Sequence, residues 1–310
     1  MRITVSNLTK KYGTQRAVDN ISFEVKTGEI VGFLGPNGAG KTTTMKIITC
    51  FMAPSDGDIK IGEYSIHEDQ GKIKRKIGYL PENNPLYVDM YVLEYLEFVA
   101  ELNGVPKDKI PRRIAEMVAV CGLNVEKHKK ISELSKGYKQ RVGLAQAMIH
   151  DPEILILDEP TSGLDPNQIV EIRKLIREIG REKTVILSTH ILPEVEATCD
   201  RILIINEGKI VADGTSEILR KQAHGQEVLK VEILDAPSKD EIISSVQQLD
   251  SVAMIDPYES SEFGFLINSK NDQSSKRNVF NLCKEKNWIL TEMTPIETKL
   301  EDVFRNLTTK

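Results

Sequence analysis

The residues with the clearest chemistry form one uninterrupted stretch, Gly35-Pro36-Asn37-Gly38-Ala39-Gly40-Lys41-Thr42-Thr43. An apolar run, 30–34, comes before it and an apolar run, 45–48, follows it, which predicts a strand, a tight turn and a helix. Glycines let the turn bend around an anion, while its N–H groups and the helix N-terminus supply partial positive charge. Lys41 is then expected to reach the β- and γ-phosphates of a nucleotide, and the Thr42 hydroxyl to ligate Mg²⁺.

Two adjacent carboxylates, Asp158 and Glu159, follow the buried-type strand 154–157. Two acids side by side at the end of a strand are unusual without a cation. Asp158 is expected to hold Mg²⁺, directly or through water, and Glu159 to take a proton from the water that attacks the γ-phosphate. The alternative is an unpaired acid pair on the surface, which the phosphate loop in the same chain makes less attractive.

Three other residues are candidates for the functional site because of their positions in the predicted strands and helices. Tyr12 lies in a predicted antiparallel hairpin over 3–25, where it either stacks on adenine, worth ~1–3 kcal/mol, or packs as an ordinary strand residue. Ser135 is the expected N-cap of a helix that continues through Met148. His190 follows the buried strand 185–189, and strand ends are where α/β folds place their sites, although a lone histidine is more often structural.

The elements that must position these residues suggest an α/β domain followed by a smaller one. Helical periodicity replaces strands from about 83 to 150, and strands and helices alternate again up to about 222. The segment 223–226 is the expected boundary. The order β-α-β-β-α-β over 227–293 predicts a small ferredoxin-like α+β domain, extended to 310 by a last helix. No catalytic constellation is visible there, so packing or regulation is its expected role.

Composition restricts the function further. The chain has 310 residues, 40% of them hydrophobic, and a net charge of -5, which gives no electrostatic reason to expect a nucleic acid partner. The four cysteines are isolated, which indicates neither a disulfide framework nor a zinc site and favours reduced cytosolic thiols. The N-terminus has the pattern of a strand rather than of a signal peptide, and no apolar run could span a bilayer, so any membrane role is expected to be peripheral.

The motifs GPNGAGKT, LSKGY, LILDEP, SGLD and STH, in this order, resemble those of the nucleotide-binding subunits of ABC transporters, from residue 1 to about 220. The resemblance implies an ATPase with the P-loop NTPase fold of the ABC cassette: a RecA-like core, an antiparallel β-subdomain and a helical subdomain. It also implies a homodimer in which each ATP lies between the phosphate loop of one copy and the signature sequence of the other.

The resemblance assigns further roles. Ser135 and the Gly137 amide would bind the γ-phosphate across the dimer, within a signature that also contains Lys136 and Tyr138. Other residues match an adenine-side loop, a loop communicating between the two sites and a switch histidine that contacts the γ-phosphate; they are Tyr12 and Val18, Asp165, and His190.

Three residues depart from the family pattern. Lys136 and Tyr138 replace a Gly and the Gln of the usual LSGGQ, and the added cation either contacts phosphate or faces solvent. Glu82 stands where most members carry a Gln that touches Mg²⁺ and the membrane partner. A carboxylate is a harder Mg²⁺ ligand but repels the γ-phosphate, so the metal must be present for the site to close.

These variants are similar to those of the exporter branch whose permeases are separately encoded. Within it, the segments 79–98 and 134–168 resemble the gliding-motility-associated ATPase subunit. The expected partners are therefore transmembrane permease subunits, contacted around 82–100, and the expected location is the inner face of the cell membrane. Two alternatives are a soluble cassette ATPase acting on ribosomes or DNA and a nucleotide-gated regulator that does not turn ATP over.

Overall fold

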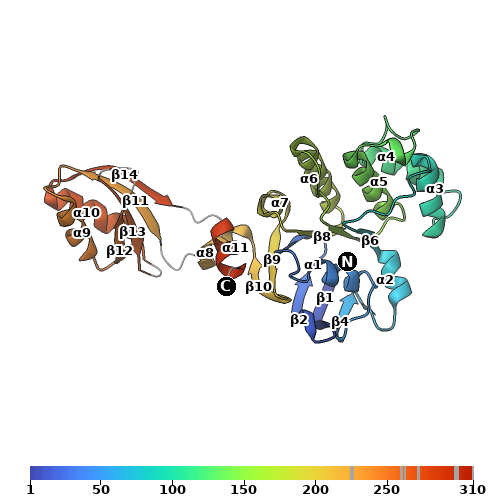
Figure 1. The fold of residues 1–310 in the computed structure, drawn as a ribbon, viewed down its shortest axis with the longest axis horizontal. Helices are drawn as coiled ribbons and strands as arrows, with labels where there is room; N and C mark the ends of the chain where they lie inside the picture. The colour runs from blue at the N-terminus through green and yellow to red at the C-terminus, as the bar shows by residue number, and fades with distance from the viewer. Residues whose placement is uncertain (224–226, 259–260, 262, 271–272, 297–299, 309–310) are drawn as a thin grey trace. The chain divides into compact units, whose positions relative to one another are not determined.

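The computed structural model describes residues 1–223, 227–258, 261, 263–270, 273–296 and 300–308. The chain forms two compact units, Met1–Ser216 with Asn306–Lys310, and Glu217–Arg305 (Figure 1). Each unit has its own sheet structure and its own apolar core.

The first unit begins with an antiparallel sheet. Its strands lie in the order β2-β1-β4-β5, with the bounds β1 Ile3–Tyr12, β2 Gln15–Val25, β4 Asp56–Ile61 and β5 Tyr64–Ser65. The predicted hairpin is confirmed, because β1 and β2 pair antiparallel up to the Tyr12↔Gln15 pair. Alternate residues such as Ile3 and Val5 are buried against the second sheet, which makes this layer a support for the strand that carries the phosphate loop.

The second sheet of this unit has the order β10-β9-β3-β8-β7-β6. Its strands are β3 Ile30–Leu34, β6 Ile77–Leu80, β7 Ile154–Asp158, β8 Thr184–Thr189, β9 Arg201–Asn206 and β10 Lys209–Gly214. All neighbours pair parallel except β9 and β10, which form an antiparallel hairpin. Because β3, β8 and β7 are adjacent and parallel, their carboxyl ends meet at one edge of the sheet.

Helices cover this sheet and extend away from it (Figure 1). They are α1 Lys41–Ile48, α2 Gln70–Lys76, α3 Val92–Leu102, α4 Ile110–Val120, η1 Ile131–Glu133, α5 Lys136–Met148, α6 Pro166–Gly180 and α7 Leu192–Thr198. The next helix, α8 Ser216–Ala223, belongs to the second unit except for its first residue. The predicted helical region contains α3, α4 and α5, whose apolar stripes share one core with Leu155, Leu157 and Leu187 of the sheet. The observed cassette architecture is the predicted one.

The second unit confirms the predicted ferredoxin-like order. Its elements are β11 Val228–Leu234, α9 Lys239–Gln247, β12 Val252–Pro257, β13 Gly264–Ser269, α10 Lys276–Lys286, β14 Ile289–Ile296 and most of α11 Leu300–Thr308. The sheet order is β12-β13-β11-β14, all pairs antiparallel, and α9 and α10 lie on one of its faces (Figure 1). Leu229, Val231 and Ile233 alternate along β11 and are fully buried, as a sheet with one covered face requires.

Cys50, Cys121, Cys199 and Cys283 are all free thiols. Within the described ranges, every helix is too short or too polar to cross a lipid bilayer.

Candidate functional site

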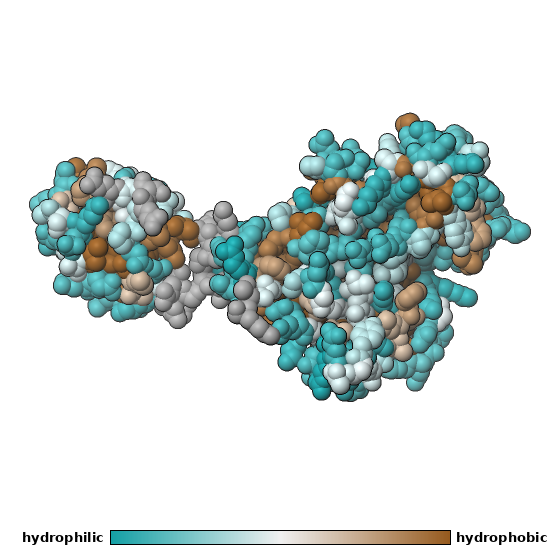
Figure 2. Space-filling view, viewed as in Figure 1, coloured by the Kyte–Doolittle hydropathy of each residue, from teal (hydrophilic) through white to brown (hydrophobic). Residues whose placement is uncertain are grey.

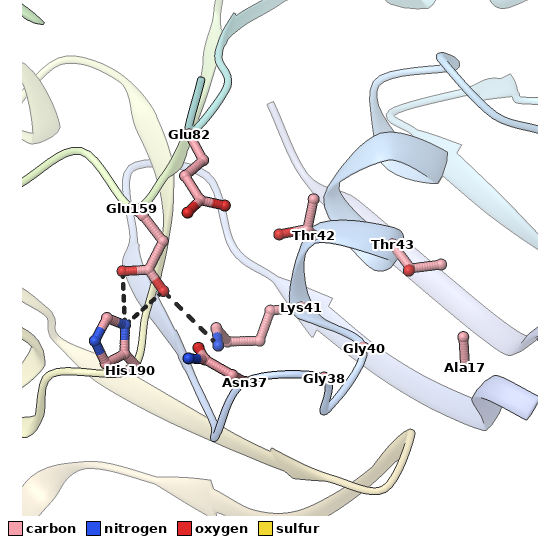
Figure 3. Close-up of a pocket in the computed structure, with 10 residues that line it drawn as sticks. All are labelled: Ala17, Asn37, Gly38, Gly40, Lys41, Thr42, Thr43, Glu82, Glu159 and His190. Carbon is pink, nitrogen blue, oxygen red and sulfur yellow. Dashed lines mark hydrogen bonds and ion pairs between the residues drawn. The ribbon is translucent and has the colours of Figure 1, made fainter. Parts of the chain in front are cut away.

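A cavity of about 380 Å³ opens where the carboxyl ends of β3, β7 and β8 meet (Figure 3). The side chains and backbone that line it come from the predicted phosphate loop, from the acid pair, from the ends of β6 and β8, and from β2; they are Ala17, Asn37, Gly38, Gly40, Lys41, Thr42, Thr43, Glu82, Glu159 and His190. The tertiary structure therefore brings together residues that are up to about 170 positions apart in the chain.

The phosphate loop has the backbone that its glycines allow. Gly38 has φ +79° and Gly40 has φ +108°, both in the left-handed region that side chains disfavour. A Cβ on Gly40 would lie 2.4 Å from the Ala17 carbonyl oxygen, and one on Gly35 would lie 2.4 Å from that of Ile205. Helix α1 begins directly after the loop, at Lys41, so its free N–H groups face the cavity.

Lys41 points into the loop itself. Its Nζ donates to the carbonyl oxygens of Gly35 at 2.8 Å and Pro36 at 3.2 Å, and lies 3.7 Å from Glu159 Oε1. Burial lowers the pKa of the Lys41 amine, and the negative charges of Glu159 and Asp158 partly offset that effect. A phosphate that binds in the loop would replace these carbonyl oxygens and compete with Glu159 for the ammonium group.

Glu159 and His190 contact each other across neighbouring strands (Figure 3). His190 Nδ1 lies 2.9 Å from Glu159 Oε1 and 3.0 Å from Oε2. The Glu159 N–H donates to the Ser188 carbonyl at 2.9 Å, and its φ of +49° turns the carboxylate from the strand end toward the cavity. The His190 side chain is 46% exposed and the Glu159 side chain 8%, so the histidine is the more accessible partner.

Asp158 is completely buried, and neither of its carboxylate oxygens has a hydrogen-bond partner among the described residues. Burial raises the pKa of this carboxyl group. A buried anion without partners is costly, which favours a cation beside Asp158, although this residue is not among those that line the cavity. Thr42 and Glu82, which do line it, both act on the Asp158 carboxyl group. In Figure 3 the Glu82 carboxylate and the Thr42 hydroxyl point toward each other, which gives oxygen ligands of the kind Mg²⁺ prefers.

The described residues contain no cluster of three or more His, Cys, Asp or Glu side chains that could hold a metal by themselves. A site made of Thr42, Asp158 and Glu82 is therefore incomplete in protein ligands. Magnesium sites at nucleotides have this character, because water and phosphate oxygens supply the other ligands. The residues present fit a metal that binds together with a nucleotide.

The signature residues lie outside the cavity. Ser135 is the N-cap of α5, as predicted, and its hydroxyl accepts from the Tyr138 N–H at 3.4 Å. The Tyr138 ring lies 6.0 Å from the Arg141 guanidinium group. Lys136 extends toward the turn before α6, where its Nζ would lie 2.0 Å from a Cβ on Gly163. In this chain the added cation therefore lies over the SGLD turn of its own copy.

Asp165 is also distant from the cavity lining. It is the N-cap of α6, and its carboxylate accepts from the Gln168 N–H at 2.9 Å. Ser135 and Asp165 are both exposed at helix starts, and neither lines the cavity of its own chain.

The two residues predicted to lie beside adenine differ in their exposure to solvent. Tyr12 is 48% exposed; its hydroxyl lies 3.0 Å from Met52 Sδ and the Lys10 ammonium lies 5.6 Å from its ring centre. Val18 is completely buried, so its side chain does not line the cavity, whereas the preceding Ala17 does. The sequence did not indicate Ala17 as a site residue, because its side chain carries no functional group. Its position at the cavity follows from the close approach of its carbonyl oxygen to Gly40.

Comparison with known proteins agrees with this geometry. A family model described as "ABC transporter" matches residues 18–162. The chain is 36% identical over 308 residues to the bacitracin transport ATP-binding protein BcrA of Bacillus licheniformis, covering 98% of this chain and 96% of that protein. It is 41% identical to the uncharacterized ABC transporter ATP-binding protein YxlF of Bacillus subtilis, covering 71% and 73%.

Solved structures give the same result. A structure described as the ATP-binding subunit of an ABC transporter superimposes with a TM-score of 0.65 at 32% identity, over 72% of this chain and 93% of that one. The ATP-binding cassette MJ0796, described as dimeric in a post-hydrolysis state with ADP and Pi bound, gives a TM-score of 0.63 at 27% identity, over 69% and 98%.

Proposed function

This chain belongs to the ABC transporter family as an ATP-binding and ATP-hydrolysing subunit, and from that premise we propose that it powers an exporter whose permease subunits are separate chains. The bacitracin transport relative supports a transport role for the whole chain, because the similarity runs through both units rather than through the cassette alone. Export is proposed from the exporter branch that the variants at Glu82, Lys136 and Tyr138 resemble. A role in gliding motility is a more specific hypothesis. None of the relatives named above is described in that way, so we propose an exporter subunit without a link to motility. The 1–222 and 227–310 boundaries likewise stay a proposal.

We assign the roles at the site from its geometry. Glu159 acts as the general base for the attacking water, because its carboxylate faces the cavity beside Lys41 and His190, whereas the Glu82 carboxylate points toward the Thr42 hydroxyl (Figure 3). Lys41 and His190 provide positive or hydrogen-bonding groups for the β- and γ-phosphates, and the loop amides orient them. Thr42, Asp158 and Glu82 would hold Mg²⁺, which supplies charge neutralisation at the phosphates when it is bound.

Two copies are proposed to pair head to tail around ATP. The supporting observation is the location of Ser135 and Asp165, exposed at helix N-caps and away from the cavity of their own chain. An exposed Ser-capped helix N-terminus suits a γ-phosphate presented by a second chain. Lys136 then acts on the SGLD turn beside it, rather than directly on the phosphate.

The permease-facing surface is proposed to be the segment around 82–100. Figure 2 shows hydrophobic residues at the surface in the region of α3. The large apolar or aromatic side chains that this segment exposes include Tyr87, Val88, Tyr91 and Phe98. The Tyr87 ring lies 5.6 Å from that of Phe98 and 6.0 Å from that of Tyr95, so the patch is preassembled. Docking there would hold the subunit at the inner face of the membrane.

The observation that carries this proposal is the contact of Glu159 with both Lys41 and His190 at the mouth of the phosphate loop. Glu159→Gln keeps the size of the side chain and removes the base. We expect its steady-state ATPase rate to fall by ~10²- to 10⁴-fold while ATP still binds. Glu153→Gln, at the exposed start of β7, is the matched control and should keep the parent rate. Near-normal hydrolysis by Glu159→Gln would contradict the assignment.

The proposed association with separate permease subunits needs its own test. Purification of the full chain from membranes, with identification of the protein that accompanies it, should recover a permease. Recovery with ribosomes or DNA instead would favour the soluble alternative.

A further inference from the structure

A buried carboxylate outside the cavity joins the two strand ends that carry Glu159 and His190. Glu194, in the first turn of α7, is only 1% exposed. The Thr161 hydroxyl donates to its Oε1, and the Thr189 hydroxyl donates to its Oε2 at 2.9 Å. Thr161 lies two residues after Glu159, and Thr189 directly precedes His190.

Both threonine hydroxyls are buried and donate to the Glu194 carboxylate. They are 3% and 0% exposed, so each hydroxyl would lose its hydrogen bond if the carboxylate were absent. Hydrogen bonds to an ionised acceptor are roughly twice as strong as neutral ones. Thr189 Oγ1 also accepts from the Ile191 N–H at 3.1 Å, which fixes the backbone on the far side of His190.

The helix that carries Glu194 is fixed in turn against the strand leading to the phosphate loop. A Cβ on Gly32 of β3 would lie 2.7 Å from Val195 Cγ1 and 3.0 Å from Cys199 Sγ. Only glycine allows α7 to approach β3 this closely. Glu194 is therefore held against β3 while it binds Thr189, the last residue of β8, and Thr161, which lies just after β7.

We propose that Glu194 is a positioning residue for ATP hydrolysis, whose carboxylate sets the separation of the Thr161 and Thr189 segments and so keeps the Glu159 carboxylate in contact with the His190 imidazole. The inference rests on the roles proposed above for Glu159 and His190. It assigns Glu194 no contact with nucleotide or water. Its loss should consequently slow the chemical step without weakening nucleotide binding.

The primary test is Glu194→Gln in the full chain. The amide keeps the shape but replaces one acceptor oxygen with a donor. We expect kcat for ATP to fall about tenfold, the worth of one charge-assisted hydrogen bond, while KM and the Kd of a fluorescent ATP analogue change less than about twofold. Glu196→Gln, on the same helix but bonded to the Ser216 hydroxyl at 3.0 Å, is the matched control and should keep the parent kcat.

A threonine pair separates positioning from simple packing. Thr189→Val keeps the volume and removes the hydroxyl, and is expected to lower kcat about as much as Glu194→Gln. Thr189→Ser keeps the hydroxyl and should restore most of the rate. The double variant Glu194→Gln with Thr189→Val should be no slower than either single variant, because both remove the same interaction. The Thr189 variants still test the positioning role if Glu194→Gln does not fold.

Three results would overturn the inference: an unchanged kcat in Glu194→Gln, a loss of rate matched by weaker nucleotide binding, or equal effects of Val and Ser at position 189. Its failure is distinguishable from failure of the proposed function. If Glu159→Gln is inactive and Glu194→Gln is fully active, only the positioning role is lost. If Glu159→Gln stays active, the site assignment itself is wrong.

Discussion

At the scale of single residues, Gly40 is required for two separate physical reasons. Its φ of +108° lies where a side chain strains the backbone, and its Cβ position is already filled by the Ala17 carbonyl. Gly38 shares the first reason but not the second, because nothing lies within 4 Å of its Cβ position. The two glycines therefore allow backbone strain and steric overlap to be measured separately.

Gly40→Ala is expected to weaken ATP binding by more than about tenfold, since strain of roughly 1–2 kcal/mol adds to the overlap with β2. Gly38→Ala should weaken it less, through strain alone. Equilibrium binding of a fluorescent ATP analogue to the full-length variants measures both. Equal losses in the two variants would show that the contact with Ala17 does not matter for the loop.

At the scale of elements, the approach of β6 to α5 decides how the helical region attaches to the sheet. Gly78 of β6 leaves no space for a side chain, because a Cβ there would lie 2.1 Å from the Ala147 carbonyl oxygen. His150, just beyond α5, has its Nε2 3.2 Å from the Ile77 carbonyl and its Nδ1 buried without a partner. Both features test this junction.

Gly78→Ala is expected to destabilise the first unit by about 1–3 kcal/mol, the usual cost of overpacking, and more if the two backbones cannot separate. Gly71→Ala, in α2, is the opposite case, because nothing lies within 4 Å and alanine favours a helix. It should stabilise by about 0.5–1 kcal/mol. Thermal unfolding followed by circular dichroism compares the two; a neutral Gly78→Ala would mean that α5 does not pack against β6 as described.

His150 predicts a pH dependence. Burial lowers its pKa below the ordinary value of 6.5, and the charges of Lys183 and Arg113 lower it further, while its hydrogen bond to the Ile77 carbonyl opposes this. Below about pH 6.5 the unfolded chain binds a proton that the folded chain does not, so stability falls as the pH drops toward the folded pKa. The slope from this group cannot exceed about 1.4 kcal/mol per pH unit.

His150→Gln should therefore reduce the loss of stability between pH 7.5 and 5.5. The same change at exposed His128 controls for removal of a histidine. Trp288, the single tryptophan, lies in the second unit, so its fluorescence follows that unit while circular dichroism follows both. The substitution is expected to move only the circular dichroism transition, and an unchanged pH profile would exclude His150 as its source.

At the scale of the whole molecule, the nucleotide is expected to hold two copies together. With Mg²⁺ and ATP, the slow variant Glu159→Gln should sediment as a dimer, and without nucleotide as a monomer. Adding Ser135→Ala should raise the Kd of the dimer about five- to tenfold, because a hydrogen bond to the γ-phosphate is charge-assisted. Ser132→Ala, three residues earlier and also exposed, is the control. A dimer that ignores both ATP and Ser135 would contradict the head-to-tail arrangement.

Local patterns in the sequence were sufficient to predict much of the fold and part of the candidate site. The phosphate loop, the acid pair at the end of β7, the N-cap at Ser135 and the β-α-β-β-α-β order of the second unit depend on neighbouring residues and their spacing, so they could be predicted before any contact was known. Motif order also indicated the family, because each motif has a short-range structure of its own.

Only the tertiary structure decided which distant groups meet. The adjacency of β3, β8 and β7 brings Glu159 to His190, the close approach of β2 places Ala17 rather than Val18 at the cavity, and α7 buries Glu194 between two threonines. Lys136 lies over Gly163 for the same kind of reason. Contacts between segments far apart in the chain depend on how whole elements pack, and residue types and spacing along one segment carry no record of that packing.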